Sequence, residues 1–389
     1  MVAGNSVAIT GAVIGLLSLP LGWLTVKPNR IVAGTGLNLW DSLGWNGAVI
    51  LFVLWIACLL FVLAGRNKMT TIAAGVTSVA IVIFTFFFVG MAAGRLLACE
   101  EEFARVSLGA GVWTTLAGTY MVTFAVRRDL EGSAVWQLLL TWGGIASIII
   151  FLFSGWLGNL SIIQEFTGRE ERFIQELLRH VFLFGVSVGI STIIGISLGV
   201  WAARSNRAEK PIFYTTNITQ TIPSLALFGL LIAPLSALSF SFPVLREFGI
   251  RGVGIAPAMI ALVIYSLLPI VRNTFVSLRQ LAPAVIDAGK GMGMSRFQIF
   301  SKIEVPLAAP LVLEGVRTAS VQAVGLATVA ALIGAGGLGW FIFRGIGQAA
   351  PDLIILGAIP IIVLALAVDL VMRTIVKLAT PKGLQAGKQ

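Results

Sequence analysis

The stretch DAGKGMGMSRFQIFSKIEVP, residues 287–306, is a polar segment in a chain that is otherwise mostly apolar. It carries five charged side chains and closely spaced glycines. One apolar run precedes it, residues 254–278, and another follows it, residues 307–333. A bare connection between two such runs needs only a handful of residues. We therefore expect this segment to have a role of its own.

Similar apolar runs recur along the whole chain, in which 57% of residues are hydrophobic and 11% are charged. This composition is far from that of a soluble domain. A helix needs about 20 apolar residues to cross a bilayer, and these runs do not alternate as the strands of a transmembrane barrel would. The sequence predicts an all-α integral membrane protein with about ten transmembrane helices. The predicted spans are 6–26, 46–65, 69–92, 109–126, 136–157, 181–204, 211–234, 254–278, 307–333 and 353–376.

Basic residues gather in the short loops that fall on one side of the membrane if the spans alternate. Cytoplasmic loops carry an excess of Lys and Arg. We therefore expect this side and both termini to be cytoplasmic. The residues are Arg66, Lys68, Arg127, Arg128, Arg204, Arg207, Lys210, Lys290, Arg296, Lys302, Lys377, Lys382 and Lys388.

The formal net charge of +10 does not predict a nucleic-acid partner, because loop residues that orient helices account for it. Cys58 and Cys99 have no CxxC spacing, and His180 is the only histidine, so we expect no metal site and no cofactor. The run 6–26 lacks a basic segment before it and a clear cleavage site. We expect it to be a retained span and not a signal peptide.

The chain divides near residue 165. Residues 1–165 hold about five predicted spans and no recognisable motif. Residues 166–376 hold the other spans and nearly all the motif-like polar sequence, and residues 377–389 form a tail that we expect to be cytoplasmic. No internal repeat is apparent, which argues against the inverted repeats of many secondary transporters.

The polar segment itself predicts two short helices joined by a glycine turn. Ala284, Val285 and Ala288 have small or apolar side chains at helical spacing, and Gly293 ends a cluster of glycines that would break or turn the helix. Ser295 is a candidate N-cap for a second helix. Two interpretations are open: a knob that docks a cytoplasmic partner, or a hairpin that lies on lipid headgroups. The expected apolar face of the second helix consists of Phe297, Ile299, Phe300 and Ile303.

The order and spacing of residues in this segment resemble the "EAA" loop of ABC-type importer permeases, E-A-A-x3-G-x9-I-x-L-P. Three positions depart from the pattern: Asp287 stands for Glu, Gly289 for the second Ala, and Val305 for Leu. In that family the loop is a coupling helix that inserts into the ATP-hydrolysing subunit. The resemblance implies that the coupling residues are Asp287, Ala288, Gly289, Gly293, Phe297, Ile303 and Pro306.

The resemblance extends over roughly residues 181–376. NITQTIPSLALFGLL from Asn217, LVIYSLLPIVRNTF from Leu262 and ATVAALIGAGGLGWFIFRG from Ala327 look like permeases that import glycine betaine, choline and similar quaternary-ammonium osmoprotectants. This implies a type I ABC importer permease core within residues 166–376, with its coupling loop at residues 280–306. It also implies three partners: a cytoplasmic ATPase, an extracytoplasmic substrate-binding protein and a second permease subunit, which is either a copy of this chain or a different one.

GAGGLG, residues 334–339, matches the letters of a dinucleotide-binding fingerprint. That fingerprint requires a soluble strand–turn–helix context, and here a membrane span precedes it. We interpret it as a tight turn with close backbone approach. No Walker A sequence occurs, so the chain is not expected to be an enzyme, and ATP would be bound and hydrolysed by a partner.

Polar residues within predicted spans are candidates for function. We expect Asn217, Gln220, Thr221 and Ser224 to share one face of one helix, which lines either the translocation path or a helix interface. A quaternary ammonium is best recognised by aromatic faces, and Tyr265 joins the candidate path residues. The charged residues Glu314 and Arg317, and likewise Asp369 and Arg373, are expected to form structural pairs.

These observations favour the membrane subunit of an ATP-driven importer of quaternary-ammonium osmoprotectants that works by alternating access. An ion-coupled secondary transporter is the alternative, and Glu314 is its best candidate for an ion-binding carboxylate. A sensor or scaffold that moves no solute is the third hypothesis.

Overall fold

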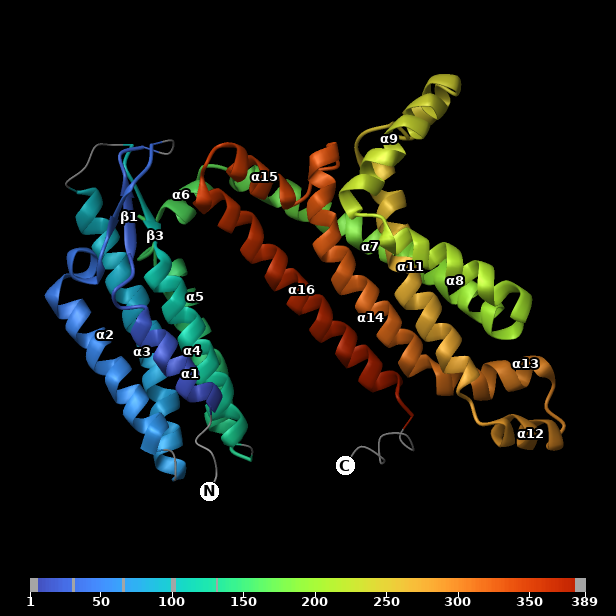
Figure 1. Ribbon diagram of the computed structural model, residues 1–389, viewed down its shortest axis with the longest axis horizontal. Helices are drawn as coiled ribbons and strands as arrows, with labels where there is room; N and C mark the ends of the chain where they lie inside the picture. The colour runs from blue at the N-terminus through green and yellow to red at the C-terminus, as the bar shows by residue number, and fades with distance from the viewer. Residues whose placement is uncertain (1–5, 30–31, 65–66, 99–102, 131, 382–389) are drawn as a thin grey trace. The chain divides into compact units, whose positions relative to one another are not determined.

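The computed structural model describes residues 6–29, 32–64, 67–98, 103–130 and 132–381 (Figure 1). Four residues named above lie outside these ranges: Arg66, Cys99, Lys382 and Lys388. The chain forms two compact units. Unit 1 comprises residues 1–168 with the short segment 348–352, and unit 2 comprises residues 169–347 and 353–389.

Unit 1 is a bundle of helices around a core of small and apolar side chains. The close approach of α1 to α4 depends on glycine, because a Cβ on Gly11 would lie 2.8 Å from the carbonyl oxygen of Gly118. Trp23 and Trp55 are fully buried in this core. The helices of unit 1 are α1 (Ser6–Leu17), α2 (Leu39–Ala64), α3 (Lys68–Leu97), α4 (Ala110–Asp129), α5 (Ala134–Phe153) and α6 (Ser161–Thr167).

A small antiparallel sheet of β1 (Leu24–Lys27), β2 (Thr35–Leu37) and β3 (Arg105–Leu108), in the order β2-β1-β3, completes unit 1. Asp352 is buried beside this sheet, where it accepts a hydrogen bond from Ser107 Oγ at 2.5 Å and lies 4.0 Å from Lys27 Nζ. This contact explains why the segment 348–352 belongs to unit 1.

Unit 2 is built on three long helices that pack along one another, α7, α11 and α14. The hairpin α12–α13 lies at one end of α11 and α14, and α9 and α15 lie at the other end (Figure 1). The elements are α7 (Glu170–Arg204), α8 (Asn206–Thr221), α9 (Ser224–Ser241), α10 (Val244–Glu247), α11 (Ile255–Arg279), α12 (Pro283–Gly291), α13 (Arg296–Ile299), a π-helical turn (Phe300–Glu304), α14 (Val305–Val329), a 3-10 turn (Ala330–Ile333), α15 (Gly339–Gly347) and α16 (Pro351–Ala379).

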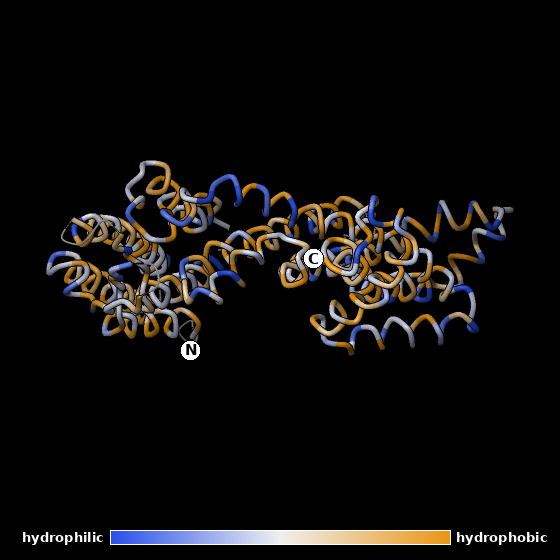
Figure 2. The backbone as a smooth tube through the Cα atoms, turned by 90° about the horizontal axis from the view of Figure 1, so that it is seen from above, coloured by the Kyte–Doolittle hydropathy of each residue, from blue (hydrophilic) through white to orange (hydrophobic). Residues whose placement is uncertain are grey.

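The prediction of a helical membrane protein is confirmed: within the described residues, 8 helices are long and apolar enough to cross a bilayer. Figure 2 shows apolar colouring along most of the helical tube. Three predicted spans differ from the structure. The span 109–126 forms the helix α4, but α4 is not among these eight helices. The span 6–26 is helical only to Leu17, because Leu24 onward pairs in the sheet. The span 211–234 is interrupted by the break between α8 and α9.

Candidate functional site

The polar segment of the sequence forms a helical hairpin between α11 and α14. α12 leads into a turn at Gly293, α13 follows, and the π-helical turn joins α13 to α14 without a break. Pro283 lies at the first turn of α12, where the missing N–H of proline leaves no helical bond unmade. The predicted pair of short helices joined by a glycine turn is confirmed.

Gly293 forms the turn of the hairpin. Its φ angle is +78°, in the left-handed region that favours glycine. Its N–H donates to the Lys290 carbonyl at 2.9 Å, and the Met294 N–H donates to the Gly289 carbonyl at 3.1 Å. These two bonds form the Schellman arrangement that ends a helix. A Cβ at Gly293 would have no neighbour within 4 Å, so the backbone conformation, and not crowding, requires glycine here.

Ser295 is the N-cap of α13, as predicted. The Gln298 N–H donates to Ser295 Oγ at 3.3 Å, and the Ser295 N–H donates to Gln298 Oε1 at 2.8 Å, which completes a capping box. The predicted apolar face is wrong at Phe297, which is 75% exposed, whereas Ile299 is buried. Residues two apart on a helix point in different directions, so one face could not hold both.

Gly289 is the buried residue of α12. A Cβ at this position would lie 2.8 Å from Ile303 Cδ1 and 3.5 Å from Ile299 Cγ1. The absence of a side chain therefore lets α12 pack directly against the π-helical turn. The departure of Gly289 from the EAA pattern corresponds to a close contact between the two arms of the hairpin.

The outer surface of the hairpin combines exposed apolar side chains with a charged pair. Met292 is 72% exposed, and Phe297 is similarly exposed. Asp287 accepts a hydrogen bond from Lys290 Nζ at 2.9 Å, and both side chains are exposed. Ala288 and Pro306 are also exposed, whereas Ile303 is half-buried. We call Met292, Phe297, Asp287 and Lys290 the hairpin surface.

Arginine side chains join the ends of the helices near the base of the hairpin. Arg204, the last residue of α7, donates to Glu304 in the π-helical turn at 2.5 Å, and its guanidinium lies 5.1 Å from the centre of the Phe300 ring. Arg279, at the end of α11, donates to Asn206 Oδ1 at 2.8 Å. The sequence predicts Arg204 only as a charge that orients the helices. The available signal was Glu304, a carboxylate between two positions of the motif pattern, Ile303 and Val305.

The four candidate path residues of the sequence analysis do not lie on one helix. α8 ends at Thr221, and Ile222 is extended, with φ −72° and ψ 127°. Pro223 causes the break, because a residue before proline is disfavoured in the helical region. Ser224 therefore begins α9. Asn217 and Thr221 are exposed on α8.

Gln220 and Tyr265 are brought together at this break. Pro269 has no N–H, so the Tyr265 carbonyl, four residues earlier in α11, lacks its helical partner. Gln220 Nε2 donates to that carbonyl at 2.8 Å. In return, the Tyr265 hydroxyl donates to the Ile222 carbonyl, which the break at Pro223 leaves outside α8. Two carbonyls freed by two prolines are thus satisfied by one reciprocal contact.

The GAGGLG sequence is a close backbone turn, as predicted. Gly334, Gly336 and Gly337 all have positive φ. The Gly337 N–H donates to Glu176 Oε2 at 2.5 Å, and the Leu338 N–H donates to His180 Nδ1 at 3.3 Å. Two side chains of α7 therefore hold the turn before α15.

The two expected charge pairs form and are joined. Arg317 donates to Glu314 Oε2 at 2.9 Å and to Asp369 Oδ1 at 2.6 Å, and Arg373 pairs with Asp369 at 2.8 Å. The network connects α14 to α16. Among the described residues there is no group of three or more His, Cys, Asp or Glu that could hold a metal ion.

Two protein-family models match the chain. Residues 4–163 match the N-terminal domain of the ABC transporter permease YehY. Residues 195–382 match the binding-protein-dependent transport system inner membrane component. The two models thus fall on the two halves of the chain.

Curated relatives match about half of the chain. The osmoprotectant import permease protein OsmW of Salmonella typhimurium is 38% identical over 53% of this chain and 91% of its own length. The glycine betaine/carnitine/choline transport system permease protein OpuCB of Bacillus subtilis is 37% identical over 54% of this chain and 89% of its own length. A chain from inward-facing structures of the MetNI methionine ABC transporter covers 55% of this chain at 19% identity, with a TM-score of 0.47.

Proposed function

We propose a transport function for this chain from the premise that it belongs to the family of binding-protein-dependent ABC importer permeases, the membrane subunits of ATP-driven importers. It is a multi-pass membrane protein, and in this family ATP hydrolysis belongs to a separate subunit. Its own part is to bind the ATPase through the hairpin and to move solute between its long helices by alternating access.

The observation that carries this proposal is the anchored hairpin. Met292 and Phe297 are apolar side chains exposed on a polar loop, a pattern typical of a protein-binding surface. Arg204 ties the same hairpin to the end of α7 through Glu304. A force on the hairpin surface would therefore reach a long helix directly. The coupling residues are Asp287, Ala288, Gly289, Gly293, Phe297, Ile303 and Pro306.

The proposed partners are a cytoplasmic ATPase at the hairpin, a substrate-binding protein at the opposite end of unit 2, and a second permease subunit. The proposed location is the bacterial inner membrane, with the hairpin and both termini in the cytoplasm, because Lys290, Arg296 and Lys302 lie in the hairpin. The chain itself would bind no cofactor. The division into a region 1–165, a permease core 166–376 and a tail 377–389 is part of the same proposal.

The proposed substrates are glycine betaine and related quaternary-ammonium osmoprotectants. The names of the relatives support this class, since OsmW is an osmoprotectant import permease and OpuCB transports glycine betaine, carnitine and choline. Of the candidate path residues, Asn217, Thr221 and Ser224 would line the path. Gln220 and Tyr265 would maintain the broken helix beside it, because both are engaged in the reciprocal contact.

The test is uptake of labelled glycine betaine into proteoliposomes that contain the chain with its co-purifying partners. Uptake should require internal ATP and should persist when ionophores collapse proton and sodium gradients. Uptake that ignores ATP and stops with an ionophore would contradict the proposal and support the ion-coupled alternative, in which Glu314 binds the ion. The absence of any saturable solute uptake would favour a sensor or scaffold.

A further inference from the structure

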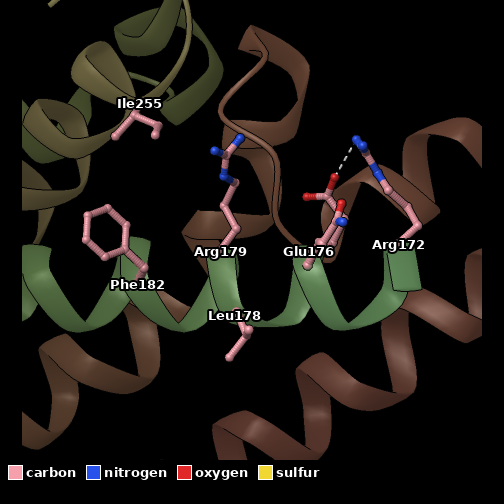
Figure 3. A pocket seen from close by; sticks show the side chains of 7 residues that line it. Arg172, Glu176, Leu178, Arg179, Phe182 and Ile255 are labelled. Carbon is pink, nitrogen blue, oxygen red and sulfur yellow. Dashed lines mark ion pairs between the residues drawn. The ribbon is translucent and has the colours of Figure 1, made fainter. Parts of the chain in front are cut away.

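An open pocket of ≈ 530 Å³ lies on unit 2, lined by α7 residues and by Ile255 at the start of α11 (Figure 3). Its α7 residues lie at the far end of that helix from Arg204. Arg179 and Arg204 are separated by 25 residues of continuous helix, or about 37 Å at 1.5 Å per residue. The pocket is therefore distinct from the hairpin, at the end of unit 2 where solute would enter under the proposed function.

The charged groups of this pocket are not equivalent. Glu176 is buried and fully engaged: one oxygen accepts from Arg172 at 2.6 Å and the other from the Gly337 N–H at 2.5 Å. Arg172 is engaged a second time, 4.9 Å from the centre of the Trp340 ring. Arg344 lies 4.8 Å from the same ring centre. These contacts engage Glu176, the only carboxylate among the lining residues, and Arg172, one of the two lining arginines.

Arg179 is different, because its guanidinium has no ion pair or hydrogen bond with any residue that the structure describes. Figure 3 shows it on the same side of α7 as Glu176 and Phe182, pointing toward the pocket. Its stem is held in place by the GAGGLG turn: a Cβ at Gly336 would lie 2.6 Å from Arg179 Cδ. A Cβ there would also lie 2.8 Å from Glu176 Oε2, so the glycine makes room for both side chains. Two arginines against one glutamate also leave the pocket with an excess of one positive charge.

An apolar wall lies beside Arg179. Phe182 follows it by three residues on α7, a spacing that places two side chains next to each other. The Phe182 ring is half exposed, and Ile255 faces it from α11. A guanidinium binds a carboxylate through paired charge-assisted hydrogen bonds, and an aromatic face attracts a quaternary ammonium.

We propose that this pocket is an entry site for zwitterionic solutes, in which Arg179 binds the carboxylate and Phe182 faces the quaternary ammonium. This inference rests on the proposed function, which it deepens by assigning a preference for carboxylate-bearing substrates over choline. Gly336 would act as a positioning residue by fixing the stem of Arg179.

The test compares glycine betaine with choline, which share a trimethylammonium group but differ in the carboxylate. Saturation-transfer NMR on the full chain in lipid nanodiscs measures direct binding of each. Wild type should bind glycine betaine saturably, and Arg179→Gln should weaken that binding by at least about tenfold and leave choline unchanged. Arg179→Lys keeps the charge but loses the planar guanidinium that can form paired hydrogen bonds, so its affinity for glycine betaine should be intermediate. The matched control is Arg251→Gln, an exposed arginine outside the pocket, which should behave as wild type.

Equal glycine betaine affinity in wild type and Arg179→Gln would overturn the inference, as would equal weakening of choline, or no saturable binding by wild type. A loss of ATP-driven uptake that is equal for both solutes, with unchanged direct binding, would also overturn it, because it would assign Arg179 to contact with a protein partner. If uptake is ATP-driven but binding of glycine betaine does not depend on Arg179, the proposed function stands and the assignment of the pocket fails. A lack of ATP-driven uptake by wild type would remove that function, and the NMR comparison would still decide the pocket.

Discussion

The guanidinium of Arg204 and the carboxylate of Glu304 lie 2.5 Å apart although 100 residues separate them in the sequence. The Arg204 side chain is 50% exposed and the Glu304 side chain 18% exposed. A pair of this exposure contributes only about 0.2–1 kcal/mol to stability. Its importance is geometric, because it joins the end of α7 to the hairpin that we propose to be moved by the ATPase.

We expect Arg204→Gln and Glu304→Gln each to lower ATP-driven uptake while the protein still inserts and its thermal stability changes little. The reversed pair, Arg204→Glu with Glu304→Arg, should recover part of the lost uptake, since the contact is remade with opposite charges. Uptake rates of wild type, the two single Gln variants and the combined variant Arg204→Gln with Glu304→Gln form the double-mutant cycle. Independent, additive losses in that cycle would show that the ion pair does not transmit the motion.

The turn of the hairpin gives a second prediction. An L residue in the left-handed conformation of Gly293 costs roughly 1–2 kcal/mol, which is about a 5- to 30-fold change in population. Gly293→Val should therefore reduce uptake strongly, and Gly293→Asn should be milder, because asparagine tolerates this conformation. The control is Gly291→Val, at a helical position with no neighbour within 4 Å of a Cβ. If Gly293→Asn and Gly293→Val were equally impaired, contact with the partner, and not backbone conformation, would be the reason for glycine. The bulkier Gly293→Trp should abolish transport without preventing insertion.

Gly289 gives a third prediction, because alanine at this position restores the EAA pattern. The added Cβ would lie 2.8 Å from Ile303 Cδ1. We expect Gly289→Ala to lower uptake by a few-fold, since the arms of the hairpin must separate slightly. Adding Ile303→Val removes the colliding methyl group and should restore uptake. Failure of the second substitution to rescue the first would show that the close contact is not what selects glycine.

The reciprocal contact between Gln220 and Tyr265 gives a fourth prediction, which concerns stability. Tyr265→Phe leaves the Ile222 carbonyl without its donor, and Gln220→Leu does the same to the Tyr265 carbonyl. Each should lower the free energy of unfolding by about 1–3 kcal/mol. The control Asn217→Leu, exposed on the same helix, should not alter the melting temperature of the detergent-solubilised protein. Melting temperatures that are equal across all three variants would contradict this assignment.

The sequence predicted the parts of the structure that depend on local pattern. Long apolar runs gave most of the spans, and the glycine cluster gave the turn at Gly293 and the cap at Ser295. The break at Pro223 was not predicted, because the polar residues before it were assigned to the same span as the apolar residues after it. Nor did it predict the sheet, whose strands are short and pair over long separations.

Local sequence also does not indicate which distant residues come into contact. Nothing local to Arg204 indicates that it binds Glu304, and nothing local to Arg179 indicates that Gly336 makes room for it. The glycines of residues 334–339 were correctly interpreted as a turn, but their partners on α7 follow only from the packing of unit 2.

The most direct test of the central claim is the number of glycine betaine molecules imported per ATP hydrolysed by the reconstituted complex. It should be measured for wild type and for a variant whose hairpin surface is altered, Met292→Asp with Phe297→Asp. We predict that wild type imports glycine betaine in a fixed ratio to the ATP hydrolysed. The variant should insert normally, but it should either import less glycine betaine per ATP or fail to bind the ATPase. An unchanged ratio with the ATPase still bound would contradict the claim that this hairpin couples ATP hydrolysis to transport.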